Sequence, residues 1–144
     1  MTIQVSTKPI SKASIVVGYG LSTLSALFML MDGVMKLFKP AFIVEATTQL
    51  GFSEAVVVPL GIVLTVSTLL YILPKTSILG AILLTGYLGG AVATHVHAGH
   101  GAFEMLFPAI FGVFIWGGLV LRNPVLRMLL PFQQSVSLIE EPLT

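Results

Sequence analysis

The sequence predicts an all-α integral membrane protein, a bundle of four helices that cross the bilayer. Three observations lead to this fold class: ionisable residues are rare, apolar residues are abundant, and the charges divide the chain into segments of spanning length. Only 9% of the 144 residues are Asp, Glu, Lys or Arg, whereas 56% are hydrophobic. A soluble domain has roughly 25% charged residues, because polar groups must cover much of its surface. These numbers exclude a disordered chain and argue strongly against a soluble globule.

The positions of the four helices follow from the spacing of the charges. A helix needs about 20 residues to cross roughly 30 Å of hydrocarbon. Four segments without charged residues come close to this length or exceed it, namely 13–31, 55–74, 76–103 and 105–121. With their flanking turns they predict helices at about 13–38, 54–73, 76–96 and 102–121, which form one transmembrane domain within residues 1–144.

Two shorter segments are predicted to lie at the membrane surface. In residues 40–50, Pro40 suits a first helical turn, an apolar face follows, and Gly51 ends the segment. This segment is too short to span, so we expect it in the headgroup plane. A second interfacial segment is expected at about 124–131, after Asn123 and Pro124 end the fourth span.

The basic residues predict the orientation. With four spans both termini share one side, and that side carries five basic residues, whereas the other side carries only Lys36 and Lys39. Basic residues prefer the cytoplasmic side, which places both termini in the cytoplasm. The five are Lys8, Lys12, Lys75, Arg122 and Arg127.

The polar chemistry gathers toward the other side. Asp32 follows Lys12 at the same spacing at which His95 follows Lys75, so both should lie at the same depth near the outer interface. Asp32 and Lys36 share a helical face, and Tyr87 lies two turns before His95 on one stripe. We therefore expect Asp32, Lys36, Tyr87 and His95 to line one outward-facing cavity. The alternative is that Asp32 and Lys36 form an ordinary interfacial pair whose lysine extends to the headgroups.

Metal binding is not predicted. His97, His100 and Glu104 offer nitrogen and oxygen donors, but their spacing matches no strong metal signature and the intervening loop is rich in glycine. We expect His97 and His100 to be solvated loop residues. The absence of cysteine excludes thiol/disulfide enzymes, and the net charge of +1 gives no indication of nucleic-acid binding.

Small residues in the third span predict close helix packing. Gly86, Gly90 and Thr94 form a row at four-residue spacing, which lets helix backbones approach each other in lipid. This row predicts that the third span is the central helix of the bundle. It also predicts that a bulky residue at Gly90 costs more stability than one at Gly99 in the loop. A dimer interface is the alternative use of such a row, so a homo-oligomer stays open.

Several motifs resemble the DoxX-like family over about residues 15–131. They are Gly33 with Lys36 and Leu37, the turn at 73–76, Gly80 with Ala81, the run at 85–95, residues 106–108, residues 116–118, and Leu121 with Arg122. The resemblance implies a small four-helix protein of the bacterial inner membrane. It carries no established catalytic set onto this chain.

The polar residues and the resemblance together leave two hypotheses of function. The first is a redox-associated membrane subunit that binds a quinone or another lipophilic molecule through Asp32, Lys36, Tyr87 and His95. Without cysteine, its electrons would come from a partner oxidoreductase subunit or a bound cofactor. The second is a non-enzymatic membrane scaffold or a carrier of a small solute.

Overall fold

The computed structural model describes residues 11–129, and within that range every regular element is a helix. Four of its helices are long and apolar enough to cross a membrane: Lys12–Phe38, Glu54–Ile72, Ser77–His97 and Ala102–Arg122. The predicted all-helical fold with four helices of membrane-spanning length is therefore confirmed. The elements are α1 (Lys12–Phe38), α2 (Ala41–Gln49), the 3-10 turn η1 (Glu54–Val56), α3 (Val57–Ile72), α4 (Ser77–His97), α5 (Ala102–Arg122) and α6 (Pro124–Leu129).

Local chemistry sets the ends of these helices. At the start of α1, the Ser11 side chain accepts a hydrogen bond from the Ser14 backbone N–H at 3.1 Å, which satisfies a donor that lacks a helical partner. α1 ends where Lys39 adopts a left-handed conformation, with φ of 51°, and donates its N–H to the Met35 carbonyl. Pro40 then starts α2, which is the short helix predicted over 40–50. Its predicted place in the headgroup plane stays a prediction.

The four long helices form a ring. α1 contacts α3 and α5, α4 contacts the same two helices, and no Cα atoms of α1 and α4 come within 8 Å of each other. The prediction of a central third span is therefore wrong. α4 is one side of the ring, and it faces α1 across a space that side chains only partly fill.

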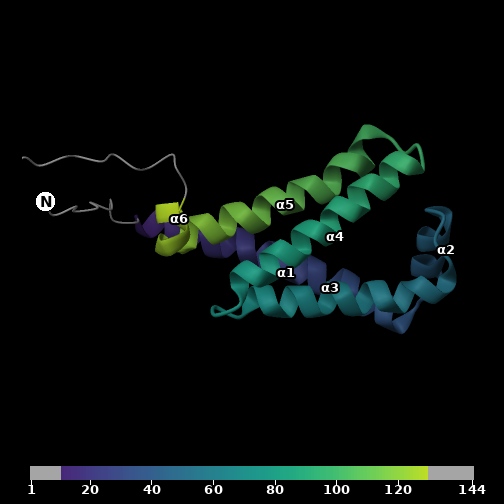
Figure 1. The fold of residues 1–144 in the computed structure, drawn as a ribbon, viewed down its shortest axis with the longest axis horizontal. Coiled ribbons are helices and arrows are strands. Elements are labelled where there is room, and N and C mark those ends of the chain that lie inside the picture. The colour runs from purple at the N-terminus through teal and green to yellow at the C-terminus, as the bar shows by residue number, and fades with distance from the viewer. Residues whose placement is uncertain (1–10, 130–144) are drawn as a thin grey trace, which may run out of the picture.

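The two ends of the ring differ. The start of α1, the α3–α4 turn, the end of α5 and α6 lie together at one end, which we call the terminal end (Figure 1). Toward the opposite end, the α4–α5 pair diverges from α1 and α3, and α2 lies beside this opening (Figure 1). We call this opposite part the open end.

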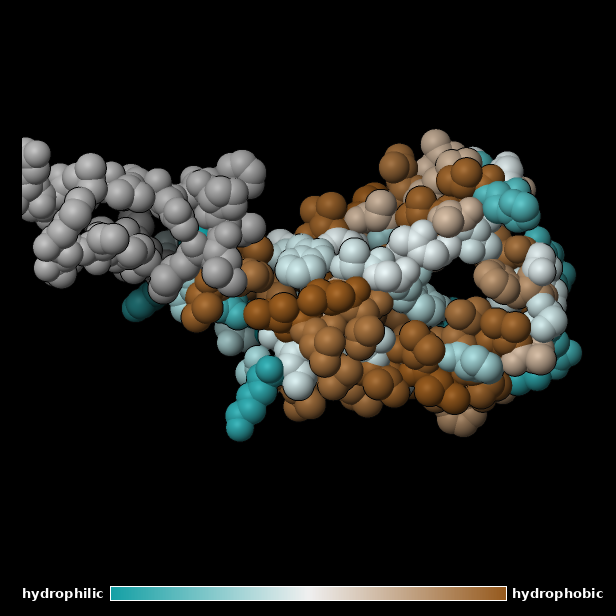
Figure 2. Space-filling view, viewed as in Figure 1, coloured by the Kyte–Doolittle hydropathy of each residue, from teal (hydrophilic) through white to brown (hydrophobic). Residues whose placement is uncertain are grey.

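The core lies between the terminal end and the middle of the ring. Its fully buried side chains include Leu64, Tyr71, Leu84, Ile115 and Leu119. The Tyr71 hydroxyl lies 2.8 Å from Ser22 Oγ and donates to the Ile115 carbonyl at 3.0 Å, which joins α3 to α1 and α5. Apolar residues cover much of the outer surface (Figure 2), as expected for helices that face lipid.

Candidate functional site

The candidate site is a pocket of about 450 Å³ at the open end. Figure 2 shows an opening in the surface there, between the α4–α5 pair and the region of α2. The pocket fills the space that separates α1 from α4. Helices α1, α2, α4 and α5 contribute most of its lining, among them Phe28, Asp32, Lys36, Ile43, Thr47, Tyr87, Ala91, His95, Phe107 and Phe111.

All four residues that the sequence predicted for a binding site line this pocket. Asp32 and Lys36 come from α1, and Tyr87 and His95 come from α4 on the opposite wall. No Cα atoms of these two helices come within 8 Å of each other, so the two pairs of residues lie on opposite walls of the pocket.

Asp32 and Lys36 form an ion pair along one turn of α1. The Lys36 side chain is 13% exposed and the Asp32 side chain 29%, so the pair is partly withdrawn from the surface. An ion pair in this position leaves lone pairs and N–H groups that a ligand can use, because each partner satisfies only part of the other's capacity. The arrangement therefore places both a donor and an acceptor on the α1 wall.

His95 also has a partner, which comes from the loop after α4. Its Nδ1 lies 2.9 Å from Nδ1 of His100, which follows α4 in the connecting loop. One Nδ1 must carry the proton and donate it, and the other must be unprotonated and accept it. The tautomer of one ring therefore fixes the tautomer of the other. The prediction that His100 is a solvated loop residue is wrong, because it is half-buried against His95.

Aromatic side chains close the inner part of the pocket. The Phe28 and Phe111 rings stack with centroids 4.4 Å apart, and the Phe107 centroid lies 5.5 Å from that of Phe28. All three residues line the pocket. Its inner wall is therefore aromatic, and ionisable side chains stand on the α1 and α4 walls. A site with this division suits a ligand that has an apolar body and a polar head.

A sequence model of the DoxX-like family matches residues 20–118. This range is more than half of the chain. The chain belongs to the DoxX-like family. The resemblance found in the sequence is thus confirmed, and the matched range includes every ionisable residue of the pocket. No curated protein and no solved structure was found to match this chain.

Two parts of the pocket in this DoxX-like protein were not predicted. α2 contributes Ile43, Ala46 and Thr47 to the lining, and Leu50 directly after it contributes too, so one face of this segment covers the pocket. α5 contributes Phe107 and Phe111, which belong to a stripe with Phe103 at four-residue spacing. That stripe was a visible signal for an apolar helix face. Spacing alone could not show that it faces a cavity.

The remaining metal candidates, His97 and Glu104, do not line the pocket. His97 is exposed at the end of α4, and Glu104 is exposed in the first turn of α5. Within residues 11–129, no three His, Cys, Asp or Glu side chains come together in a way that could hold a metal ion.

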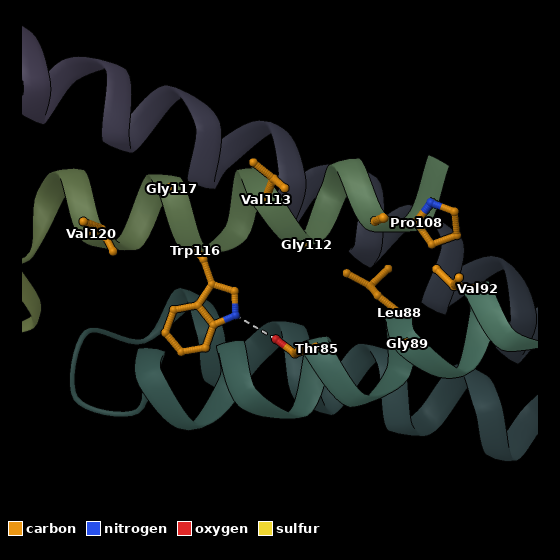
Figure 3. A pocket seen from close by; sticks show the side chains of 11 residues that line it. Thr85, Leu88, Gly89, Val92, Pro108, Gly112, Val113, Trp116, Gly117 and Val120 are labelled. Carbon is orange, nitrogen blue, oxygen red and sulfur yellow. Dashed lines mark hydrogen bonds between the residues drawn. The ribbon is translucent and has the colours of Figure 1, made fainter. Parts of the chain in front are cut away.

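The DoxX-like chain also has an apolar groove between α4 and α5, of about 610 Å³ (Figure 3). Its lining includes Leu88, Val92, Val113 and Val120, and none of its residues is ionisable. The indole Nε1 of Trp116 already donates to Thr85 Oγ1 at 2.8 Å (Figure 3). The groove thus offers little chemistry for a polar head, and the pocket at the open end is the better candidate.

Proposed function

We propose that this membrane protein binds a quinone or a similar lipophilic molecule in the pocket at the open end, as a redox-associated subunit. The observation that supports this proposal is the lining itself. An ion pair and a histidine stand on facing walls of a cavity whose inner part is aromatic. Ionisable groups at membrane depth are costly and usually serve a ligand or a pathway.

The chemistry of a quinone head matches these groups. Its two carbonyl oxygens accept hydrogen bonds, which the Lys36 ammonium, the Tyr87 hydroxyl or a His95 N–H can donate. Asp32 holds the ammonium on the α1 wall. His95 and His100 form a short hydrogen-bonded pair between the pocket and the α4–α5 loop, through which a proton can pass to or from the head.

The volume also suits such a ligand. Pockets for small molecules usually measure about 300–1,000 Å³, and this one measures about 450 Å³. A quinone ring can occupy the part near the ionisable residues while the start of its tail lies against Phe28, Phe107 and Phe111. The remaining tail can extend into lipid through the opening between the helix pairs (Figure 2).

The test is retention of the ligand by purified protein. The full chain is solubilised in mild detergent, and the extract is searched for quinone by mass spectrometry and absorption spectroscopy. Asp32→Asn and His95→Ala should each reduce retention, and the double variant should be no worse than the worse single one, because both act on one bound head. His97→Ala is the matched control, since His97 does not line the pocket.

Two results would reject the proposal. One is protein that retains no small molecule and whose thermal unfolding is unchanged by an added short-chain quinone. The other is independent, additive effects of the two substitutions on retention. Stoichiometric co-purification of another protein without a bound molecule would instead favour a scaffold.

We also propose that the protein lies in the bacterial inner membrane with both termini in the cytoplasm. The support is the five-to-two distribution of basic residues between its two sides. Because the chain has no cysteine, single cysteines can be introduced without background labelling. A cysteine in the 97–101 loop should react with an impermeant reagent on intact cells, and one at Lys75 should not. Labelling in the opposite sense would reverse the orientation.

A further inference from the structure

A second site lies at the terminal end, around Arg122. This residue ends α5, and its guanidinium carbon lies 5.5 Å from the centroid of the Tyr19 ring and 5.3 Å from that of Tyr71. The two rings come from α1 and α3, so three helices meet at this one cation. None of these residues lines the pocket at the open end.

The guanidinium is incompletely satisfied. Its Nε and Nη2 atoms are buried and have no hydrogen-bond partner among residues 11–129. Aromatic faces attract the positive charge, but a ring face supplies no lone pair of the strength that an oxygen supplies. The Tyr71 hydroxyl does not accept a hydrogen bond from Arg122, and its own partners are Ser22 and the Ile115 carbonyl. A guanidinium stays charged under all conditions met by a protein, so it cannot relieve this situation by losing its proton.

The neighbouring Arg127 shows the contrast. Its Nε donates to the Val120 carbonyl at 3.0 Å, and its Nη2 lies 3.5 Å from the Leu121 carbonyl. Arg127 thereby uses the last carbonyls of α5, where a cation is favoured. The described part of the chain supplies no such acceptor to Nε and Nη2 of Arg122.

The surroundings hold Arg122 in place. Gly18 and Gly118 bring α1 and α5 together so closely that a Cβ at Gly18 would lie 3.1 Å from the Arg122 backbone nitrogen. Tyr71 is fixed by its hydroxyl contacts. The Tyr71 ring and the Arg122 backbone are therefore positioned by the packed core before any ligand arrives, whereas Tyr19, 55% exposed, covers the cation from the surface.

The charges at this end select an anion. Lys12, Lys75, Arg122 and Arg127 lie at the terminal end, and the four acidic residues of the described range all lie toward the open end (Figure 1). Arg122 is the last residue of a helix long and apolar enough to cross a membrane, and basic residues at the ends of such helices usually lie near the headgroups. A phosphate matches the planar fork of a guanidinium, and anionic headgroups are attracted to basic surfaces.

We propose that Arg122, held between Tyr19 and Tyr71, binds the phosphate of an anionic phospholipid in the leaflet next to the terminal end. The ligand is recognised by its phosphate oxygens, which accept the guanidinium N–H groups. The same chemistry would accept free phosphate, so the experiment has to separate the two sources. The site is independent of the quinone proposal, since it shares no residue with the pocket.

The test uses the full chain in detergent and native mass spectrometry. Phosphatidylglycerol and phosphatidylcholine are titrated separately, and the wild type should bind phosphatidylglycerol more tightly. Arg122→Gln should weaken that binding about tenfold or more, because it removes a charge-assisted contact. Arg122→Lys keeps the charge without the fork and should give an intermediate loss. Lys75→Gln and Arg127→Gln are the matched controls, each losing one positive charge at the same end, and should change binding less than about twofold.

Further measurements separate the remaining outcomes. Displacement of the lipid by inorganic phosphate would assign the site to phosphate in general, and failure of inorganic phosphate to displace it would assign the site to the lipid. Thermal unfolding shows whether Arg122→Gln is folded, and Arg122→Lys decides the matter where it is not. Equal binding of the two lipids by the wild type would overturn the proposal. So would unchanged phosphatidylglycerol binding in both Arg122 variants, as expected if Glu140 or Glu141 of the same chain neutralised Arg122.

Discussion

The terminal end of this molecule and the pocket face of α4 use glycine in opposite ways. At the terminal end, Gly18, Gly80 and Gly118 let backbones touch, and a Cβ at any of them would collide with a neighbouring helix or turn. At the open end, Gly86 and Gly90 face the pocket, and a Cβ at either would meet nothing within 4 Å. Gly33 and Gly61 also let α1 and α3 touch beside the pocket, so the space-leaving glycines are those on the pocket face of α4.

The comparison shows that a small residue in a membrane helix has two distinct uses. A missing side chain brings helices together only where another backbone is present to fill the space. Where the facing helix is too distant, as α1 is from α4, the same omission enlarges a cavity.

Gly80→Leu should be the most damaging glycine substitution. A side chain at this position would collide with backbone atoms of Leu70 and Tyr71, which cannot move without displacing the α3–α4 turn. Overpacking against backbone should cost on the order of 3 kcal/mol or more, and the variant should fail to accumulate or unfold at much lower temperature. Gly89→Leu is the control in the same helix, because a Cβ at Gly89 would meet no neighbouring atom within 4 Å. Similar thermal unfolding of the two variants in detergent would contradict the comparison.

The two ion pairs of the open end should respond differently to loss of one partner. Asp32→Asn leaves the Lys36 ammonium, which is 13% exposed, without its carboxylate, and should destabilise the fold by about 1–3 kcal/mol. The Lys39–Glu54 pair, at 2.6 Å, is 34% and 62% exposed, so Glu54→Gln should cause no measurable change. Thermal unfolding of both variants tests this difference. Asp32→Leu combined with Lys36→Met should recover stability relative to Asp32→Asn, since no charge is left unpaired.

Much of the fold could be predicted from the sequence because hydrocarbon imposes a strict length on uncharged helices. The spacing of the charged residues from Lys12 to Arg122 is enough to find the four candidate spans. Equal spacing from Lys12 and Lys75 is also why Asp32 and His95 were expected at one level. In the structure both residues line the same pocket.

The rotation and tilt of the helices could not be predicted in this way. Whether Gly90 faces a neighbour or a cavity depends on how far α4 diverges from α1, which spacing does not encode. The contact between the His95 and His100 rings depends on the conformation of the loop after α4. Gly99 allows that conformation because it adopts a left-handed backbone, with φ of 69°. The cover that α2 gives the pocket depends equally on tertiary packing.

Gly90→Leu and Gly99→Leu should reverse the order of stability that the sequence predicted. Gly99 has a left-handed backbone that a leucine adopts with strain, so Gly99→Leu should cost about 1–2 kcal/mol. Gly90→Leu places its side chain in open space and should change stability by about 0.5 kcal/mol or less. It should nevertheless abolish retention of a ligand, because it fills the pocket. A larger loss of stability at Gly90 than at Gly99 would mean that α4 packs against another helix.

The smallest effect should separate the histidines of the α4–α5 region. His100→Ala removes the 2.9 Å contact to His95 and should cost about 0.5–1 kcal/mol, the net value of one hydrogen bond. His97→Ala, at an exposed site on the same helix as His95, should lie within experimental error. His100→Ala should also weaken ligand retention, because the His95 ring loses the contact that orients it beside the pocket, whereas His97→Ala should not. Equal behaviour of the two variants in unfolding and in retention would show that His100 does not position His95.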